Sequence, residues 1–368
     1  MPFKVLEGLP RGAKIIQSSF QINFPASFPC YPYAHPSLGN MVKEFPCTWV
    51  WESKNVRVFG PTIAMADGKN QLLAQATIEW GRKANENWVF RRCCLPPTEK
   101  LRGKSLIMAS TGGDTYFHWM TDVMPKYFLA QKAGYSLKDF DHFIVNGTKK
   151  PFQKESLARL GIPLDKCRTF AAEEKNYLAE CAVLPSLQGR SGVVSPRTVQ
   201  QIRATFPVLR VSKKQGSKIF IGRSGAADRK LLHEKVIKSF LGSRGFQIFE
   251  PANFSISEQA ELFFSADLVV VAHGAAATNL IFCRPGTWVI ELFSPEYVNP
   301  CYRDLSASAG LRHASLIGSG KDWKIETRNI YTNAPITVSL GQIKELLNEL
   351  GTTGQSTSRT AACRKKPR

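Results

Sequence analysis

The chain has 368 residues, of which 43% are hydrophobic, and its 49 Lys and Arg against 29 Asp and Glu give a formal net charge of +20. This length exceeds what one hydrophobic core usually serves, so we expect two domains with a cleft between them. No run approaches the roughly eighteen uncharged apolar residues of a membrane span, which excludes that class and favours a soluble globular protein.

The positive charge predicts attraction to a polyanion: nucleic acid, an anionic membrane surface or a phosphorylated substrate. Nucleic acid is the less favoured partner, because the chain contains no helix-turn-helix, RNP-type aromatic strand or zinc motif. Nine cysteines with no Cys/His ligand spacing, including one close pair at Cys93-Cys94, indicate reduced thiols and no metal site. The start MPFKVLEGLPRGAK lacks the apolar stretch of a secretory signal, so we expect a cytoplasmic location.

Residues 1–110 predict an irregular, strand-rich region with many prolines and a hairpin-type turn in GPTIAMADGKNQL. From LRGKSLIMAS through TYFHWMTDVMPKYFLAQKAG to DHFIVNG, the order strand, helix, strand predicts the beginning of a parallel sheet. Two helices follow: ESLARLGIP, which ends on a glycine, and SPRTVQQIRATF, with Ser195 as N-cap and Pro196 in its first turn.

A basic, glycine-containing segment, PVLRVSKKQGSK, interrupts this pattern, and we place there a boundary between a domain of residues 1–206 and one of residues 207–351. Strands and helices then alternate as KIFIGRS, RKLLHEKVIKSFLGSRG, FQIFEP, SISEQAELFFSA, DLVVVAH, AATNLIFCR and TWVIELFS. This alternation is typical of a doubly wound α/β domain. The tail, residues 352–368, predicts a basic, disordered segment that can bind an anionic surface.

The stretch FHWMTDVMP places His118 and Asp122 four residues apart. Pro125 favours an extended residue before it, but a helical turn from Tyr116 to Val123 would put both side chains on one face. Such a pair can act in acid/base chemistry. The alternative, which the spacing alone favours, is a core histidine held by a nearby carboxylate.

The second half contains the features of an anion-binding site. DLVVVAHGAAATNLIF puts His273 and Gly274 at the carboxyl end of a buried strand, where small residues that open a helix let a phosphate approach backbone N–H groups. Arg223 follows the first strand of this half, and Arg229 with Lys230 opens the next helix, so their cations suit a diphosphate. The alternatives are a tight turn without a ligand and an ordinary charged loop.

Acidic positions of this half receive two different interpretations. Glu291, at the end of strand TWVIEL, is placed to accept hydrogen bonds from ribose hydroxyls or to cap a neighbouring helix. Glu258 and Gln259 lie near a helix start that Ser255 or Ser257 caps, so we interpret this pair as structural.

Three stretches together resemble the signature stretches of glycosyltransferase family 61: TYFHWMTDVMPK, IGRSGAADRK and HGAAATNLIF, in the same order and with similar spacing. The likeness extends from about Trp51 to about Gly318 and so covers most of the chain. It implies a GT-B-like architecture of two Rossmann-like doubly wound domains that face a cleft. It further implies inverting, metal-independent transfer from a nucleotide sugar, with no cofactor. The chain is similar to the bacterial branch, which is associated with capsular and other surface polysaccharides.

The resemblance also implies roles for individual residues. Asp122 or His118 is the base that removes the acceptor proton, and the sequence does not separate the two. Two arginines and the turn after DLVVVA hold the departing diphosphate, with a threonine reaching a phosphate and an asparagine tying the turn to its helix. The donor-side residues are Arg223, Arg229, His273, Gly274, Ala275, Thr278, Asn279 and Glu291.

The expected function is transfer of a sugar from a nucleotide sugar, UDP-linked by preference, to a glycan or lipid-linked acceptor by an enzyme peripheral to the inner membrane. One alternative is an epimerase-like enzyme that uses the same diphosphate site and leaves the nucleotide sugar intact. The other is a non-catalytic basic protein that binds nucleic acid.

Overall fold

The computed structural model describes residues 4–60, 62–92, 97–170, 175–208, 217–320 and 333–353. The Cys93-Cys94 pair, most of the predicted boundary segment PVLRVSKKQGSK and the basic tail beyond residue 353 lie outside these ranges. Within them, helices and strands are mixed along the whole chain, which confirms the predicted α/β class and the strand-rich beginning.

Nine of the described strands form the first sheet, in the order β1-β8-β7-β6-β12-β9-β10-β11, with β2 also paired to β6. The strands are β1 (Lys4–Leu6), β2 (Lys14–Gln17), β6 (Thr48–Phe59), β7 (Ala64–Ala66), β8 (Gln71–Leu73), β9 (Thr98–Ile107), β10 (His142–Val145), β11 (Cys167–Thr169) and β12 (Asn176–Pro185). Strands β12, β9, β10 and β11 run parallel, as predicted from the strand, helix, strand order. The predicted hairpin turn joins β7 to β8, and Asp67 Oδ1 accepts from the backbone N–H groups of Lys69 and Gln71.

Six of the described strands form the second sheet, in the order β14-β13-β15-β16-β17-β4, and every neighbouring pair is parallel. They are β4 (Cys30–Tyr31), β13 (Ser217–Ile221), β14 (Phe246–Ile248), β15 (Ala266–Ala272), β16 (Trp288–Phe293) and β17 (Arg312–Ile317). The remaining strands, β3 (Phe20–Phe24) and β5 (Met41–Phe45), form an antiparallel ribbon.

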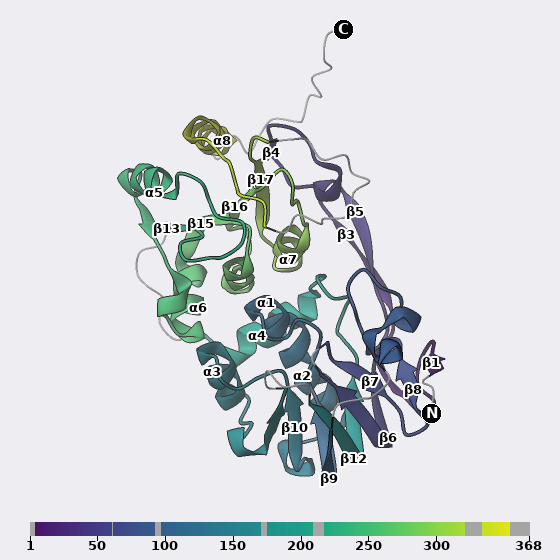
Figure 1. Cartoon of the computed structure of the whole chain (residues 1–368). Helices are drawn as coiled ribbons and strands as arrows, with labels where there is room; N and C mark the ends of the chain where they lie inside the picture. Colours follow the sequence, from purple (N-terminus) through teal and green to yellow (C-terminus); the bar gives the residue numbers. More distant parts are fainter. Residues whose placement is uncertain are drawn as a thin grey trace.

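The helices connect these strands and pack between and around the sheets. They are α1 (Tyr116–His118), the π-helical segment η4 (Trp119–Val123), α2 (Met124–Ala133), α3 (Pro151–Arg159), α4 (Pro196–Thr205), α5 (Glu234–Ser243), α6 (Ile256–Ser265), the 3₁₀-helical segment η8 (Ala275–Phe282), α7 (Cys301–Ser308) and α8 (Leu340–Thr353). Figure 1 shows the second sheet above the first, with α1 and α4 between them and the ribbon β3-β5 along one side. Among the described ranges, no helix has the length and apolar character that a membrane crossing needs.

Both sheets contain a point where the chain reverses its progress across the sheet. Strand β13 lies between β14 and β15, so the chain moves to one side of β13 and then returns to the other. Strand β9 lies between β10 and β12 in the same way. At such switch points the loops at the carboxyl ends of neighbouring strands separate and leave a crevice, in which ligands of open α/β sheets bind.

The largest apolar cluster extends from one sheet to the other. It includes Leu106 on β9 and Val183 on β12, residues of the intervening α1, η4 and η8, and Val269 and Val271 on β15. These side chains are buried, and burial of each large aliphatic side chain contributes about 1.5–3 kcal/mol. The two sheets are therefore held in a fixed relation by packed helices, and the segments after β9 and β15 meet.

The helix around Pro125 differs from the prediction in one respect. Met124, which precedes the proline, is helical with φ −58° and ψ −41°, although a residue before proline usually is extended. The π-helical turn η4 accommodates the proline, because Pro125 then lies in the first turn of α2, where a backbone N–H is not required. The predicted helical turn is confirmed and continues without a break to Ala133.

The N-terminal region contributes to both sheets. Strand β4 pairs with β17, so residues that we assigned to the first domain complete the edge of the second sheet. The buried Arg303 on α7 donates to the carbonyl groups of Pro25 and Gly39 and lies 2.8 Å from Asp304. A buried guanidinium is stable only when such partners are present, so these contacts hold the N-terminal segment against α7.

Candidate active site

The side chains of His118 and Asp122 face each other, as their spacing predicted. The Nδ1 atom of His118 lies 2.7 Å from Oδ2 of Asp122. The hydroxyl groups of Ser191 and Thr121 donate to the same carboxylate, at 3.2 Å and 3.3 Å. Asp122 is buried, whereas the side chain of His118 is 17% exposed, so His118 is the member of the pair that a ligand reaches more easily.

A buried lysine lies one turn after the carboxylate. Lys126 is 3% exposed and its Nζ donates to the carbonyl oxygen of Ala109 at 2.6 Å. Burial lowers the pKa of Lys126 to about 8, and the charge of Asp122 opposes this shift. The positive charge of Lys126 in turn offsets the negative charge of Asp122 in a region that water does not reach.

A continuous series of ring contacts connects this pair to the second sheet. The His118 ring lies 5.0 Å from Trp80 and 5.1 Å from Phe117, measured between ring centroids. Phe117 packs edge to face with Tyr302 at 5.4 Å, and Tyr302 packs with His273 at 5.2 Å. The predicted base and the turn after β15, residues 273–279, therefore belong to one packed site, and we call this turn the donor turn.

Hydrogen bonds make the same connection. The hydroxyl of Tyr116 donates to Oδ1 of Asn279 at 2.7 Å, and Nδ2 of Asn279 donates to Oε1 of Gln259 at 2.6 Å. Asn279 thus ties the donor turn to α6 and also to α1, a wider role than the one predicted. Ser255 is the N-cap of α6, with Glu258 in a capping box, which confirms the structural interpretation of the Glu258 and Gln259 pair.

Tyr116→Phe is expected to lower the free energy of unfolding by about 1 kcal/mol, because the amide oxygen of Asn279 loses its donor in buried surroundings. Urea unfolding of the variant and the wild-type protein provides the measurement. An unchanged midpoint with an unchanged denaturant slope would mean that this hydrogen bond does not help to hold the two sheets together.

Arg223 and Gly274 lie against each other at the switch point between β13 and β15. A β-carbon at Gly274 would overlap the guanidinium of Arg223. The backbone of Gly274 is extended, with φ 168°, so glycine is required here for space and not for its conformational freedom.

The Nη2 atom of Arg223 donates to the carbonyl oxygen of Asp228 at 2.5 Å, while Nε is buried without a partner. Burial and the charge of Arg229 both lower the pKa of Arg223. A half-buried cation in this state favours an incoming anion.

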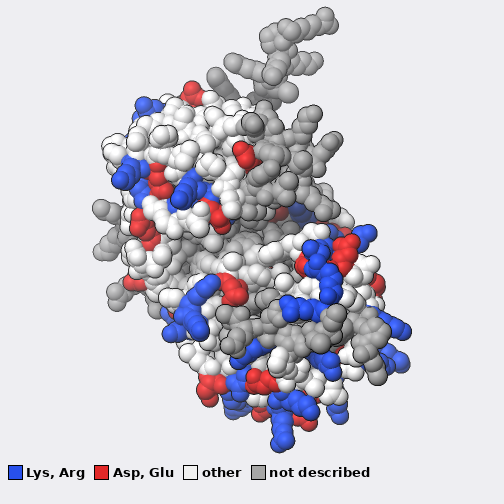
Figure 2. Space-filling model, in the orientation of Figure 1, with Lys and Arg blue, Asp and Glu red and all other residues white. Residues whose placement is uncertain are grey.

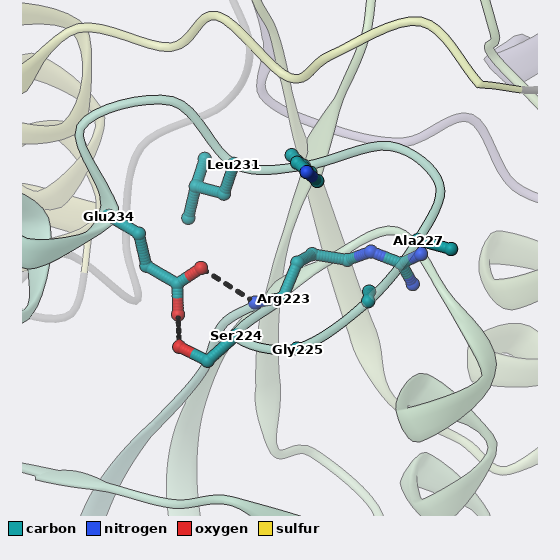
Figure 3. Close-up of a pocket in the computed structure, with 8 residues that line it drawn as sticks. Arg223, Ser224, Gly225, Ala227, Leu231 and Glu234 are labelled. Atoms are coloured by element: carbon teal, nitrogen blue, oxygen red, sulfur yellow. Dashed lines mark hydrogen bonds between the residues drawn. The ribbon is translucent and has the colours of Figure 1, made fainter.

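The loop after β13 encloses a cavity of about 480 Å³. Its lining residues are Arg223, Ser224, Gly225, Ala226, Ala227, Lys230, Leu231 and Glu234. Figure 3 shows the carboxylate of Glu234 bonded to the backbone N–H of Arg223 and to the hydroxyl of Ser224, while the Arg223 side chain extends away from it, towards Ala227. Lys238 also pairs with Glu234, at 3.1 Å. The Glu234 carboxylate therefore holds the loop and does not bind the guanidinium of Arg223.

Arg229 has a different position from the one predicted. The helix α5 begins at Glu234, after His233 with φ 55°, so Arg229 and Lys230 lie in the loop and do not open the helix. The Arg229 guanidinium lies 5.0 Å from the centroid of the Tyr297 ring, and Tyr297 packs against His273. Both Arg223 and Arg229 lower the pKa of His273 by their charge, after burial, so the two cations surround this histidine.

Glu291 does not occupy the position of a ribose ligand, and that prediction is not retained. Its side chain is fully buried, with Oε1 2.5 Å from Nδ1 of His273 and Oε2 2.9 Å from Nε2 of His313. The Nδ1 atom of His313 lies 2.9 Å from the hydroxyl of Ser27. Burial raises the pKa of Glu291 well above its usual range and lowers the pKa of His313 to about 3. Both carboxylate oxygens are engaged by histidines, so neither is free to accept from a ribose hydroxyl in this structure.

Thr278 also has an internal partner. Its hydroxyl donates to the carbonyl oxygen of Ala275 at 2.7 Å, and the side chain is fully buried. The predicted contact of Thr278 with a phosphate is therefore not retained. The segment after Gly274 is 3₁₀-helical from its first residue, so the backbone of Ala275 remains at the start of a short helix at the sheet edge, as predicted.

Several residues of the site were absent from the prediction. They are Trp80 and Ser191 beside the base, and Tyr302, His313 and Ser27 beside the donor turn. One sequence signal for Ser191 exists: Gly-Arg-Ser-Gly occurs twice, at 189–192 after β12 and at 222–225 after β13. Each copy lies at the carboxyl end of a strand beside a switch point.

The comparisons with known proteins agree with this geometry. The family model described as Glycosyltransferase 61 matches residues 116–290, which include α1, the loop after β13 and the turn after β15. A search of curated proteins found no significant match. No three His, Cys, Asp or Glu side chains in the described part of the chain are grouped so as to hold a metal ion. The match covers the segments that build the site and indicates that this protein is a glycosyltransferase.

Proposed function

We propose that this glycosyltransferase moves a sugar from a nucleotide sugar to a glycan or lipid-linked acceptor with inversion at the anomeric carbon. The observation that supports this best is the meeting of two switch points. The segment after β9 carries the pair of His118 and Asp122, the segment after β13 carries the cations Arg223 and Arg229, and the segment after β15 carries His273 and Gly274. Base and leaving-group site lie on opposite sides of a short series of ring contacts, which suits in-line displacement.

On the donor side, Arg223 and Arg229 hold the diphosphate against the backbone around Gly274. The absence of a side chain at Gly274 lets the Arg223 guanidinium lie beside the N–H groups that open η8, and the two guanidinium groups offset the charge that develops on departure. These cations take the part that a metal ion has in other transferases, which supports the proposal of metal-independent transfer. The nucleotide is proposed to be UDP, in line with the family resemblance.

His273 is proposed to donate a hydrogen bond from Nε2 to the diphosphate. In a network that carries no net charge, Ser27 donates to Nδ1 of His313, Nε2–H of His313 donates to Glu291, and the protonated carboxyl of Glu291 donates to Nδ1 of His273. The raised pKa of Glu291 and the lowered pKa of His273 support this arrangement, since both favour neutral forms. The proton of His273 then resides on Nε2.

Glu291→Gln is therefore expected to keep kcat within about threefold of wild type, because the amide donates to His273 and accepts from His313 as the neutral carboxyl does. Glu291→Leu removes the partner of Nδ1 of His273 and of Nε2 of His313 and should lower activity about 10–100-fold. Steady-state kinetics on both variants test this. A loss of about 1,000-fold or more in Glu291→Gln would show that Glu291 acts as an anion, as in triads that hold a histidine tautomer with a carboxylate.

On the acceptor side, His118 is proposed to be the base and Asp122 to orient it. The Asp122 carboxylate is buried and already accepts from two hydroxyl groups, whereas His118 is partly exposed and bonds Asp122 through Nδ1. Nε2 of His118 is then left to take the proton of an acceptor hydroxyl as its oxygen attacks the anomeric carbon. The sequence allowed either residue as the base, and this geometry favours His118.

The proposed architecture is GT-B-like, with an acceptor-side part built on the first sheet and a donor-side part built on the second. The arrangement of the two sheets in Figure 1 supports it, as does the flavodoxin-like order β14-β13-β15-β16-β17 of the second. The division of the chain near residues 206 and 207 remains a proposal, with β4 as an N-terminal contribution to the donor side.

The proposed cellular role is surface polysaccharide synthesis at the cytoplasmic face of the inner membrane. The net charge of +20 supports contact with anionic lipid, to which each nearby basic residue contributes about 1 kcal/mol. Figure 2 shows Lys and Arg mainly over the lower part of the molecule, mixed with Asp and Glu. Flotation with anionic liposomes tests this role, and loss of binding after deletion of residues 354–368 would locate the contact in the basic tail. Absence of flotation at low salt would contradict it.

Thermal unfolding with UDP, GDP, CMP or ADP, with and without EDTA, tests the proposed reaction. A nucleotide at about 100 times its dissociation constant adds about 2.7 kcal/mol and raises the melting temperature by several degrees. A shift with UDP that survives EDTA supports the proposal, and a shift with another nucleotide changes the donor. Analysis of the reaction products provides a separate test, because an intact nucleotide sugar of altered stereochemistry would identify an epimerase. No shift with any nucleotide, together with tight and salt-dependent oligonucleotide binding, would overturn the proposed site.

A further inference from the structure

A second cavity, of about 470 Å³, lies at the switch point of the first sheet. Its walls come from the start of β6, the segment after β8 and the segment after β12. The lining residues that matter here are Trp49, Gln75, Ile78, Trp80, Arg190 and Ser191. Its volume is in the range of small-ligand sites, about 300–1,000 Å³. Neither the family match, which begins at Tyr116, nor any sequence motif assigns a ligand to most of this cavity.

The cavity adjoins the acid/base pair on two sides. Ser191, in its wall, donates to Oδ2 of Asp122 at 3.2 Å. Trp80, also in its wall, lies 5.0 Å from the ring of His118 at an interplanar angle of 35°. Gly112 makes this approach possible, since a β-carbon there would overlap both Trp80 and His118. A molecule in the cavity is therefore within reach of the atom that we propose as the base.

The chemistry of the walls combines a flat apolar surface with hydrogen-bonding groups. Trp80 leaves 56% of its surface exposed, so part of its flat apolar surface is open to a ligand. Trp49 and Gln75 are fixed by a hydrogen bond from the indole Nε1 to Oε1 at 3.1 Å. Arg190 is 68% exposed and has only a loose pairing with Glu44 at 3.8 Å, so its guanidinium can turn to a ligand at little cost.

We propose that this cavity is the acceptor subsite and that it takes a pyranose ring of a glycan, with the apolar face of the sugar stacked on Trp80. Gln75, Ser191 and Arg190 then bind the hydroxyl groups at the ring edge, and one hydroxyl is directed to His118. A pyranose has one apolar face and a polar edge, which the walls match. A lipid chain matches them less well because it cannot satisfy these polar groups. This inference rests on the proposed function, since it assigns the acceptor half of the same site.

Saturation-transfer NMR with four simple probes tests the inference without knowledge of the natural acceptor. The probes are methyl β-glucopyranoside, methyl β-galactopyranoside, methyl α-mannopyranoside and methyl β-xylopyranoside, each added to the full-length protein with UDP. We expect at least one to receive saturation, mainly on the protons of its apolar face. Trp80→Ala should weaken that signal about tenfold, Trp80→Phe should keep most of it, and Phe28→Ala, which removes another exposed aromatic side chain outside the cavity, should leave it unchanged.

The possible outcomes separate the two levels of the proposal. If UDP raises the melting temperature but no pyranoside binds, or if binding survives in Trp80→Ala, the acceptor subsite is overturned while the donor site stands. If a pyranoside binds through Trp80 but no nucleotide does, the cavity is a sugar site and the proposed transfer reaction fails. If a short alkyl phosphate receives saturation and no pyranoside does, the cavity takes a lipid-type ligand and the inference is overturned.

Discussion

Asp122→Asn is expected to lower kcat about 10²–10⁴-fold while the fold is retained. In the proposed mechanism the carboxylate accepts from Nδ1–H of His118, which leaves Nε2 unprotonated and able to take the acceptor proton. The amide of asparagine can present an N–H to Nδ1 instead, which moves the proton of the imidazole to Nε2 and blocks the base. Initial rates at saturating nucleotide sugar and acceptor measure the effect.

Two further variants make this result specific. Asp165→Asn changes an exposed carboxylate of the same half that contacts no residue of the site, and should keep wild-type kcat. His118→Ala should lose at least as much activity as Asp122→Asn. If His118→Ala instead retains most of kcat while Asp122→Asn is inactive, Asp122 is itself the base. If Asp122→Asn is as active as wild type, the pair has no part in the chemistry.

Arg223→Ala is expected to lower kcat about 100-fold or more and to raise the donor KM. Its guanidinium lies against Gly274 at the end of β15, with Nε buried and unpartnered, and we propose the diphosphate as the partner that completes its hydrogen bonds. Loss of the cation removes charge stabilisation where the leaving group departs. Kinetics with varied nucleotide sugar and a thermal shift with the nucleotide alone separate turnover from binding.

The control for Arg223→Ala is Arg244→Ala. Arg244 lies after α5 and stacks on Phe240 at 4.6 Å, away from the donor turn, so its loss removes the same charge from the same half without touching the site. Arg223→Lys should fall between the two, because it keeps the charge but not the planar pair of donors. Full activity of Arg223→Ala with a nucleotide sugar would show that the donor site is wrongly placed.

Features set by local sequence were predictable. Residues four apart on a helix meet, so the pairing of His118 with Asp122 followed from spacing. Strand-helix alternation predicted parallel strands, and the side chains predicted Ser195 as one N-cap and either Ser255 or Ser257 as another, of which the structure has Ser255. The start of α5 was misplaced by five residues, from Arg229 to Glu234, because His233 adopts a left-handed conformation that residue types do not reveal.

Features set by strand register could not be read from one sequence. Glu291 looked like a ribose ligand because acids at strand ends often are, yet the register of β16 with β17 brings His313 beside it and buries both. Ser191 reaches Asp122 across 69 residues, and Ser27 reaches His313 across 286. Such contacts depend on which strands become neighbours, and no local pattern specifies that.

The pairing of β4 with β17 affects the order in which the protein can fold. Cys30 and Tyr31 pair with Ser315 and Leu316 at the edge of the second sheet. Nearby, Ser27 contacts His313, which reaches His273 through Glu291. Both contacts join segments that lie far apart in the sequence. During synthesis residues 30 and 31 emerge before β17, the last described strand of that sheet, and must wait for it. Contacts of such high sequence separation form late and slow the folding of a domain. The contact of Ser27 with His313 therefore forms only after β17 has been made.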